Sequence, residues 1–204
     1  MLAITAVSKQ ITLHAGASVS HEGVSDEALV NAIATGDRGA MRALYIRHHV
    51  RVYRFILRFI ADSSLAEDIV SDVFLDVWRQ ASGFKAKARA STWILAIARY
   101  KAVSVRRTLR DEQLDERAVL SIADPTDDAE TMVERQGRST VVRQCLSQLS
   151  TIHREVLDLV YYHEKSIDEV AQIVGVPAST VKTRIFYARK RMESLLDSAG
   201  IVRN

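Results

Sequence analysis

The chain has 204 residues, of which 48% are hydrophobic and 26% charged, with only 8 glycines and 2 prolines. This composition excludes a disordered chain and indicates one or two domains, each long enough to bury its own core. Long alternating β-branched runs and Asn-Gly or Asp-Gly hairpin turns are missing from the sequence, so we expect an all-α fold.

The net charge of +3 is unevenly distributed along the chain. Residues 25–110 hold a net charge of +7, residues 111–134 a net charge of −8 and residues 135–204 a net charge of +4. Two basic blocks joined by an acidic connector predict two small helical domains and a flexible linker. The predicted parts are a flexible N-terminal arm at 1–24, an N-terminal helical bundle at 25–110, an acidic linker at 111–135 and a C-terminal helix-turn-helix domain at 136–197.

The sequence lacks the motifs and segments that would indicate a disulfide framework, a bound metal, secretion or a membrane span. The single cysteine, Cys145, excludes an internal disulfide and starts no zinc or redox motif, so we interpret it as a small buried hydrophobe. No cationic segment precedes the short apolar stretch at the N-terminus, and no apolar run reaches the roughly 18 residues of a membrane span. We therefore expect a cytoplasmic protein without metal or cofactor.

In the N-terminal block, four helices are predicted in chain order. Ser25 can cap the first, which Gly36-Asp37 ends. The others are expected at about 38–60, 64–80 and from Ser91 or Thr92 to Leu109, with a loop of small and basic residues over 82–90.

The helix predicted over 64–80 has more apolar surface than one core face requires. Its stripe is Leu65, Ala66, Ile69, Val73 and Val77. Phe74, Leu75 and Trp78 lie outside that stripe, among Ser71 and acidic residues. Two interpretations remain open at this point: a central helix buried on several sides, or a hydrophobic and acidic docking face for another protein.

The last helix of this block combines a core stripe with an outer row of arginines. Cations and aromatics beside a loop are suited to holding single-stranded nucleic acid and an unstacked base. The candidates are Lys85, Lys87 and Arg89 on the loop and Arg99, Arg106, Arg107 and Arg110 on the helix. A second row, Arg47, Arg51, Arg54 and Arg58, is interpreted as a solvated helix face.

The C-terminal block contains the most specific local pattern. Helices are expected at about 136–149, 151–163 and 166–174, followed by a fourth that Ser179 or Thr180 caps. Ser166 and Glu169 have the spacing of a capping box, Gly175 can take the left-handed conformation, and Pro177 prevents the helix from continuing. Helix, short glycine turn and second helix form a helix-turn-helix pattern.

The helix after Pro177 has two opposed faces. Val181, Ile185, Ala188, Met192 and Leu195 form the apolar stripe. The opposite face carries Thr183, Tyr187 and Lys190, flanked by Ser179, Lys182 and Phe186. Such a face can enter a DNA major groove, whereas the alternative is an amphipathic surface helix whose charges are solvated.

Four segments, in this order, resemble the extracytoplasmic-function (group IV) bacterial sigma factors. They are LVNAIATGDRGAMRALYIRHH, AEDIVSDVFLDVW, STWILAIAR and REVLDLVYYHEKSIDEVAQIVGVPASTVKTRIFYARKRM. The resemblance covers roughly residues 25–195. It implies two helical domains that bind core RNA polymerase, at the β′ clamp and β flap, and direct it to promoters. It also implies control by an anti-sigma factor and an acidic linker in the nucleic-acid channel of the polymerase.

The resemblance assigns a role to each candidate set, and for the 64–80 helix it favours docking. The polymerase-docking residues are Asp68, Ser71, Asp72, Phe74, Leu75 and Trp78. The residues for the minus-10 element, in duplex and melted DNA, are Lys85, Lys87, Arg89, Trp93, Arg99, Arg106, Arg107 and Arg110. The residues for the minus-35 element are Ser179, Thr180, Lys182, Thr183, Arg184, Tyr187 and Lys190.

The chain departs from the family pattern at Ala86, Ala90, Tyr100, Ser104, Ser179 and Tyr187, which bears on base preference at both elements. A stand-alone helix-turn-helix regulator is the alternative function, but the sequence offers no separate dimerisation coiled coil. An enzyme built on His48-His49, His153 or His163 is a third hypothesis, which the absence of a carboxylate partner or metal spacing disfavours. We predict no catalytic residue.

Overall fold

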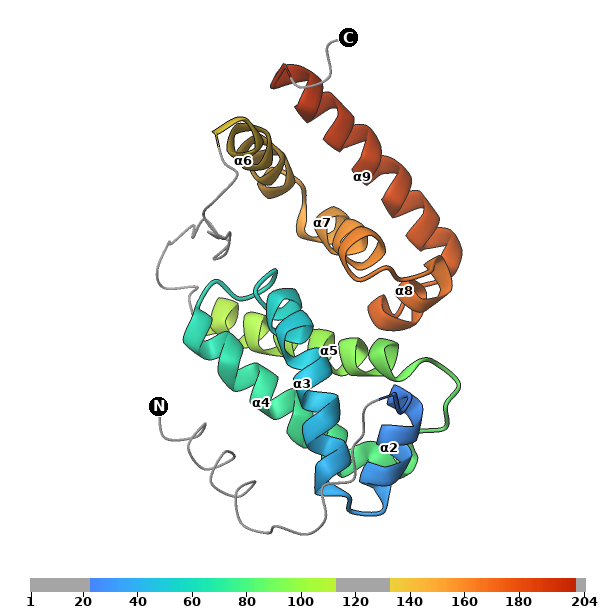
Figure 1. Cartoon of the computed structure of the whole chain (residues 1–204). Helices are drawn as coiled ribbons and strands as arrows, with labels where there is room; N and C mark the ends of the chain where they lie inside the picture. The colour runs from blue at the N-terminus through green and yellow to red at the C-terminus, as the bar shows by residue number, and fades with distance from the viewer. Residues whose placement is uncertain (1–22, 113–132, 201–204) are drawn as a thin grey trace. The chain divides into compact units, whose positions relative to one another are not determined.

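The computed structural model describes residues 23–112 and 133–200, without the side chains of 110–112 and 133–139. The chain divides into two compact units, Met1–Arg117 and Ala118–Asn204. Every regular element in the described residues is helical, which confirms the all-α prediction (Figure 1).

The described part of the first unit is a helical bundle. Helices α3, α4 and α5 pack against one another, and α2 packs on α3 (Figure 1). Its most deeply buried side chains include Leu44, Val52, Phe55, Val73 and Ile94. The elements are α2 (Asp26–Ala34), α3 (Arg38–Ile56), α4 (Ser63–Gln80), the 3₁₀ turn η1 (Ala81–Gly83) and α5 (Ala90–Glu112).

Side-chain caps begin three of these helices. The Ser25 hydroxyl accepts a hydrogen bond from the Ala28 amide, as the sequence predicts, and Asp37 and Asp62 cap α3 and α4 in the same way. Helix α3 ends at Ile56, four residues before the predicted end. The amides of Arg58 and Phe59 instead bond to carbonyls three residues earlier, which tightens the chain into a turn.

A polar cluster ties the first helix to α3. The Asp26 carboxylate accepts from Arg47 Nη1 at 3.0 Å and meets His48 Nε2 at 2.6 Å. The hydrogen bond with His48 lowers the pKa of Asp26 below its ordinary value of 3.8, burial opposes this, and the charges of His48 and Arg47 lower the pKa further. Arg47 is therefore a tertiary tie, which corrects the prediction that its whole arginine row is merely solvated.

The second unit packs α9 against α6, α7 and α8. Its core includes Val156, Leu159, Val170, Val181 and Ala188, each fully buried. Cys145 is buried at 3% exposure with a free thiol, as a small hydrophobe would be. The elements are α6 (Val133–Ser147), α7 (Thr151–Leu157), the π-helical turn η3 (Asp158–Tyr162), α8 (Ile167–Val174) and α9 (Ala178–Ser198).

The segment predicted as one helix over 151–163 changes geometry half-way. After Leu157 the chain widens into η3, and the His163 amide donates to the Asp158 carbonyl at 3.1 Å. The side chains of the same two residues meet, with His163 Nε2 3.3 Å from Asp158 Oδ2. Lys165 Nζ lies 3.6 Å from Glu169 Oε1, so the turn leading into α8 is built on polar contacts.

Candidate nucleic-acid interface

Helix α8 and the turn that follows it have the geometry that the sequence predicts. Ser166 Oγ accepts from the Glu169 amide at 3.3 Å, and Glu169 Oε2 accepts from the Ser166 amide at 3.0 Å, which completes the capping box. Gly175 ends α8 with φ 72° and ψ 36°, a left-handed conformation that glycine takes without a Cβ penalty. Helix, turn and helix therefore form a helix-turn-helix.

The start of α9 differs from the prediction. The helix begins at Ala178 with Pro177 at the N-cap, and no side chain bonds to the exposed amides there. Ser179 and Thr180 lie inside the first turn and are not its caps, because Pro177 (φ −58°) already sets the backbone for the helix. The Ser179 side chain is exposed.

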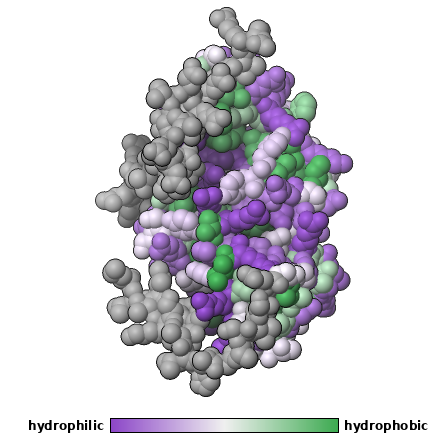
Figure 2. Space-filling model, in the orientation of Figure 1, coloured by the Kyte–Doolittle hydropathy of each residue, from purple (hydrophilic) through white to green (hydrophobic). Residues whose placement is uncertain are grey.

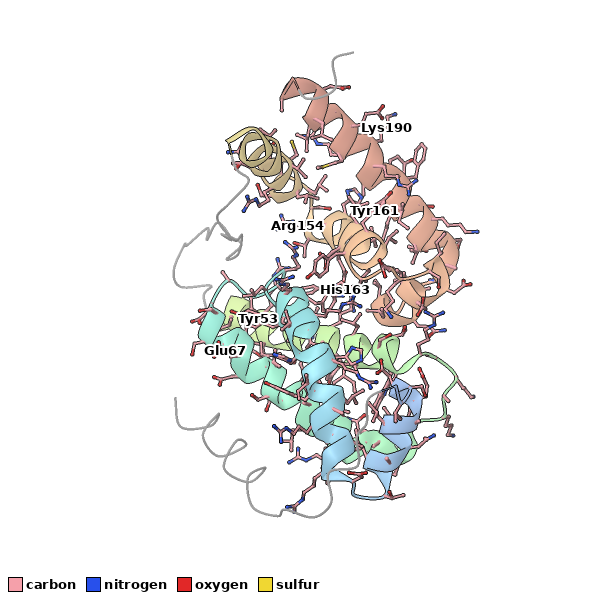
Figure 3. All side chains as sticks on the ribbon, in the orientation of Figure 1. Tyr53, Glu67, Arg154, Tyr161, His163 and Lys190 are labelled. Carbon is pink, nitrogen blue, oxygen red and sulfur yellow. The ribbon has the colours of Figure 1, made fainter. Side chains whose placement is uncertain are left out.

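The two faces of α9 separate as predicted. Val181, Ile185 and Ala188 are buried, and Met192 and Leu195 are half-buried. Thr180 and Arg184 are half-buried at the border of the faces. Lys190 extends from the side of α9 away from α7 (Figure 3). The exposed row, named the α9 outer face from here on, is Ser179, Lys182, Thr183, Phe186, Tyr187 and Lys190.

Two contacts shape the chemistry near this face. Thr183 Oγ1 donates to the Ser179 carbonyl at 3.1 Å, one turn earlier in the helix. The Arg189 guanidinium lies over the Tyr161 ring, 5.5 Å from its centroid, so this cation is directed toward η3. Figure 3 labels Tyr161 and Lys190 in the second unit.

The second candidate surface comprises the 84–89 loop and the outer side of α5. Trp93 is half-buried and its ring lies 5.0 Å from that of Phe84, which attaches the loop to the helix. Arg99 is half-buried, whereas the side chain of Arg110 lies outside the described part of the chain. The exposed cations here are Lys85, Lys87, Arg89, Arg106 and Arg107. The arrangement presents positive charge along one loop and one helix, which suits a nucleic-acid backbone.

Helix α5 begins one residue before the predicted range, and its first amide is capped from a distance. The Ala90 amide donates to Glu27 Oε1 of α2 at 2.9 Å, across 63 residues of sequence. Thr92, which the sequence offers as a possible first residue of this helix, is 1% exposed. The core stripe expected on this helix comprises Ile94, Ile97, Ala98, Val105 and Leu109; Ile94 and Ala98 are buried, whereas the other three are half-buried.

Helix α4 is apolar on two sides, and the structure separates them. Phe74 is only 3% exposed and packs edge-on against Tyr45 of α3, with ring centroids 4.8 Å apart. Its prediction as a docking contact is corrected, because α3 covers it. Leu75 is 44% exposed, Asp68 and Asp72 are exposed, and Ser71 and Trp78 are half-buried. One side of α4 is therefore buried in the bundle, as the first interpretation has it, and the other side is exposed, where docking stays a prediction.

The C-terminal end of α4 lines a hollow and contacts α5. Trp78, Arg79 and Ser82 face Ile33, Ala34 and Gly36 across a hollow of about 330 Å³. Asp76 pairs with Lys101 of α5, Oδ2 to Nζ at 2.8 Å, and lies 3.9 Å from Arg79 Nη1. The candidate docking helix and the candidate minus-10 helix are thus joined by an ion pair.

Sequence reasoning missed several exposed apolar residues beside these surfaces. Tyr100 is 76% and Val103 is 38% exposed on α5, and Phe186 is 62% exposed on α9. Tyr100 was recognised only as a departure from the family pattern and Phe186 only as a flanking residue. Figure 2 shows hydrophobic residues in separate small patches among hydrophilic ones. Their position on the helical wheel beside cations was the available signal.

Two histidines have carboxylate partners that the sequence did not predict, namely His48 with Asp26 and His163 with Asp158. Both pairs join residues brought together by folding. Within residues 23–112 and 133–200, no group of three or more His, Cys, Asp or Glu residues is placed to hold a metal ion. No helix in those same ranges combines the length and apolar character needed to cross a membrane.

Comparison with known proteins gives the same division of the chain. Residues 44–112 match the family Sigma-70 region 2, and residues 139–192 match the family Sigma-70, region 4. The chain is 31% identical over 183 residues to the ECF RNA polymerase sigma factor SigK of Mycobacterium ulcerans, covering 87% of this chain and 97% of that protein. It is 29% identical over 181 residues to the ECF RNA polymerase sigma factor SigL of Mycobacterium tuberculosis, covering 86% and 99%.

Two solved structures share the fold. CnrH, solved in complex with the cytosolic domain of CnrY, is 24% identical with a TM-score of 0.62, covering 85% of this chain and 97% of that one. RpoE of Bartonella quintana, solved with the anti-sigma factor NepR, is 23% identical with a TM-score of 0.63, covering 76% and 96%. The sequence matches over both units show that the chain belongs to the ECF RNA polymerase sigma factors of the sigma-70 family.

Proposed function

We propose that this ECF sigma factor binds core RNA polymerase through α4 and directs it to promoters through α5 and α9. The α9 outer face carries the proposal. It is exposed, carries Lys182 and Lys190, and lies on the second helix of a helix-turn-helix whose first helix begins with a capping box and ends at a left-handed glycine. Such a helix is the element that enters a major groove in helix-turn-helix proteins. The family match supports this function and not a stand-alone regulator.

On α4 we assign polymerase docking to Leu75 and its exposed neighbours. Leu75 is a large apolar side chain at 44% exposure, and Asp68 and Asp72 are exposed on the same helix. An apolar centre with a charged rim is the composition of a protein interface. Trp78, at the edge of the hollow, and Ser71 belong to the proposed surface, whereas Phe74 supports it from inside.

For the minus-10 element we assign the 84–89 loop and α5. Lys85, Lys87 and Arg89 would contact phosphates, and Trp93, held by Phe84, forms the wall beside which an unstacked base would lie. Arg99, Arg106, Arg107 and Arg110 would follow the backbone along the helix.

For the minus-35 element we assign the α9 outer face, with Thr180 and Arg184 at its border. Lysine can donate to guanine O6 and N7 in the major groove, so Lys182 is the leading candidate for a polar base contact. The other cations of the set, Arg184 and Lys190, would contact phosphates.

Regulation and location complete the proposal. We propose that the protein acts in the cytoplasm, without a cofactor or a reaction of its own, on stress or envelope-response genes. An anti-sigma factor would hold it inactive by covering the exposed apolar residues. RpoE was solved with the anti-sigma factor NepR, and CnrH with the cytosolic domain of CnrY. The acidic segment at 111–135 would occupy the basic nucleic-acid channel of the polymerase before RNA does, between domains at 25–110 and 136–197.

The test is transcription in vitro with core polymerase, the full chain and fragmented host DNA, with the RNA start sites mapped. We expect starts that depend on the chain and share two spaced upstream motifs. Leu75→Ala should lower transcription at every promoter, because it weakens docking. Lys182→Ala should change the ranking of promoters, since one good base contact contributes about 1 to 3 kcal/mol of discrimination. Specific binding of duplex DNA by the chain alone, without new starts, would contradict the proposal.

A further inference from the structure

The centre of the α9 outer face is aromatic and mainly apolar. Phe186 is 62% and Tyr187 is 54% exposed, and their rings meet edge to face with centroids 5.4 Å apart. They lie three and four residues after Thr183, so all three side chains are neighbours on one helix surface. Helical side chains lean toward the N-terminus, which brings both rings back over Thr183.

Thr183 adds a methyl group to this surface. Its hydroxyl donates to the Ser179 carbonyl at 3.1 Å, within the helix. The proton of the hydroxyl is thereby engaged within the helix, so the exposed side chain offers an outside partner its methyl group and an acceptor oxygen but no donor. The residue at the centre of the face therefore offers a base edge a methyl group in preference to a hydroxyl donor.

The charged residues around this apolar surface indicate which kind of partner it binds. Lys182 and Lys190 are exposed along the same face, before and after Phe186 in the helix. An apolar patch for a protein partner is ordinarily depleted of lysine, whereas lysines beside a reading surface suit the phosphates of DNA. In the major groove, the one base with an apolar group at its edge is thymine, through its C5-methyl group.

We propose that Phe186, together with the Thr183 methyl group, contacts the C5-methyl group of a thymine in the upstream promoter element. The upstream element then contains an A·T pair at the position that the second turn of α9 faces. This inference rests on the proposed function of α9 as the helix that enters the major groove, and it adds a specificity residue that the family resemblance did not assign.

The experiment uses holoenzyme made from core polymerase and the full chain, on a promoter taken from the mapped start sites. Each thymine of the upstream element, on either strand, is replaced in turn by deoxyuridine, which removes only the methyl group. At one position we expect transcription at limiting holoenzyme to fall about fourfold, the effect of losing one buried methyl contact.

Variants of the chain assign that effect to a residue. Phe186→Ala should cause a similar fall on the thymine template and should abolish the difference between thymine and deoxyuridine at that position. Thr183→Ser keeps the hydroxyl and removes the methyl group, so it should reduce the difference in part. Ile152→Ala is the matched control, because Ile152 is 49% exposed in the same unit but lies on α7. It should keep the full deoxyuridine effect.

The possible failures are distinguishable. If no deoxyuridine matters, or if Phe186→Ala keeps the full deoxyuridine effect, the inference is wrong, while a response to Lys182→Ala leaves the proposed function intact. If Phe186→Ala lowers transcription equally on templates with and without the upstream element, Phe186 contacts protein and the inference is overturned. If scrambling the whole upstream element changes nothing, the proposed function of α9 fails as well.

Discussion

The two helices proposed to face DNA begin in different ways. Helix α5 begins with the Ala90 amide bonded to Glu27 of α2, 63 residues earlier. Helix α9 has no side-chain cap; it follows the short helix α8, which begins with the Ser166–Glu169 capping box and ends at the left-handed Gly175, three residues before Ala178. The first unit therefore depends on a distant helix to fix the start of α5, whereas the second unit positions α9 through residues close to it in the sequence.

The largest expected effect comes from removing the distant cap. Glu27→Ala leaves the amide of the fully buried Ala90 without its acceptor, which should destabilise the first unit by about 1 to 3 kcal/mol. Both tryptophans of the sequence, Trp78 and Trp93, belong to this unit, so their fluorescence during denaturant unfolding measures it selectively.

Glu27→Gln is the matched control, because its amide oxygen can still accept from Ala90. It should recover most of the lost free energy of unfolding. Equal loss in both variants would show that the charge of Glu27, and not the cap, stabilises the start of α5.

A change at Gly175 tests the local turn of the second unit. Gly175→Ala puts a Cβ on a residue at φ 72°, where nothing lies within 4 Å of the added atom. The cost is therefore in the backbone, about 1 to 2 kcal/mol, and Gly175→Asn should cost less. Amide hydrogen exchange in α8 and α9 measures it, and unchanged exchange would contradict the role of this turn.

Removing the local cap should have a somewhat smaller effect. Ser166→Ala deletes the acceptor for the Glu169 amide, at a typical cost of about 1 kcal/mol. Faster hydrogen exchange should appear in the first turn of α8 and leave the tryptophan-monitored transition of the first unit unchanged. A shift of that transition would mean that the two units are not independent in stability.

The attachment of α2 should depend on pH. The pKa of Asp26 is lowered in the folded chain, chiefly by its hydrogen bond with His48, so its stabilising contribution is present above the ordinary value of 3.8. That contribution is lost as the pH falls through the lowered pKa. Because the pair is partly exposed, we expect less than about 1 kcal/mol.

Asp26→Asn isolates this contribution. The difference in unfolding free energy between the natural chain and the variant should shrink as the pH falls below about 4. A difference that grows on acidification would show that another group dominates.

The smallest effect compares the loops that precede α5 and α8. Ala86 and Glu164 are the non-glycine residues with positive φ in the described chain, at 50° and 54°. Glycine relieves a left-handed strain of about 1 to 2 kcal/mol but loses about 0.5 to 1 kcal/mol through its freedom in the unfolded chain. Ala86→Gly and Glu164→Gly should each gain about 0.5 kcal/mol in unfolding experiments. Destabilisation by both variants would exclude strain at these positions.

The sequence predicted those features whose causes lie within a few residues. Ser25, the Ser166–Glu169 pair and Gly175 act on amides in their own turn, and the structure confirms each one. The cap of α5 by Glu27 could not be predicted, because no local pattern relates residues 63 positions apart. Phe74 was misplaced for the same reason: its burial depends on Tyr45 of another helix.

The candidate site follows the same rule. The face of α9 was predictable because its buried residues recur with the period of the helix, which puts the exposed row on the opposite side. Tyr100 and Phe186, 76% and 62% exposed, were not predicted as contacts because the pattern on these faces is mainly one of charge. The carboxylate partners of His48 and His163 depend on tertiary contacts and turn geometry that composition does not reveal.

The ion pair between Asp76 and Lys101 bears on the accuracy of promoter recognition. It joins α4 to α5 at 2.8 Å, within a unit whose helices share one core. Under the proposed roles, the helix that docks on the polymerase and the helix that contacts the minus-10 element therefore move as one rigid body. An error of docking angle then becomes an error of reading angle of the same size, so misaligned complexes fail at the DNA as well as at the polymerase.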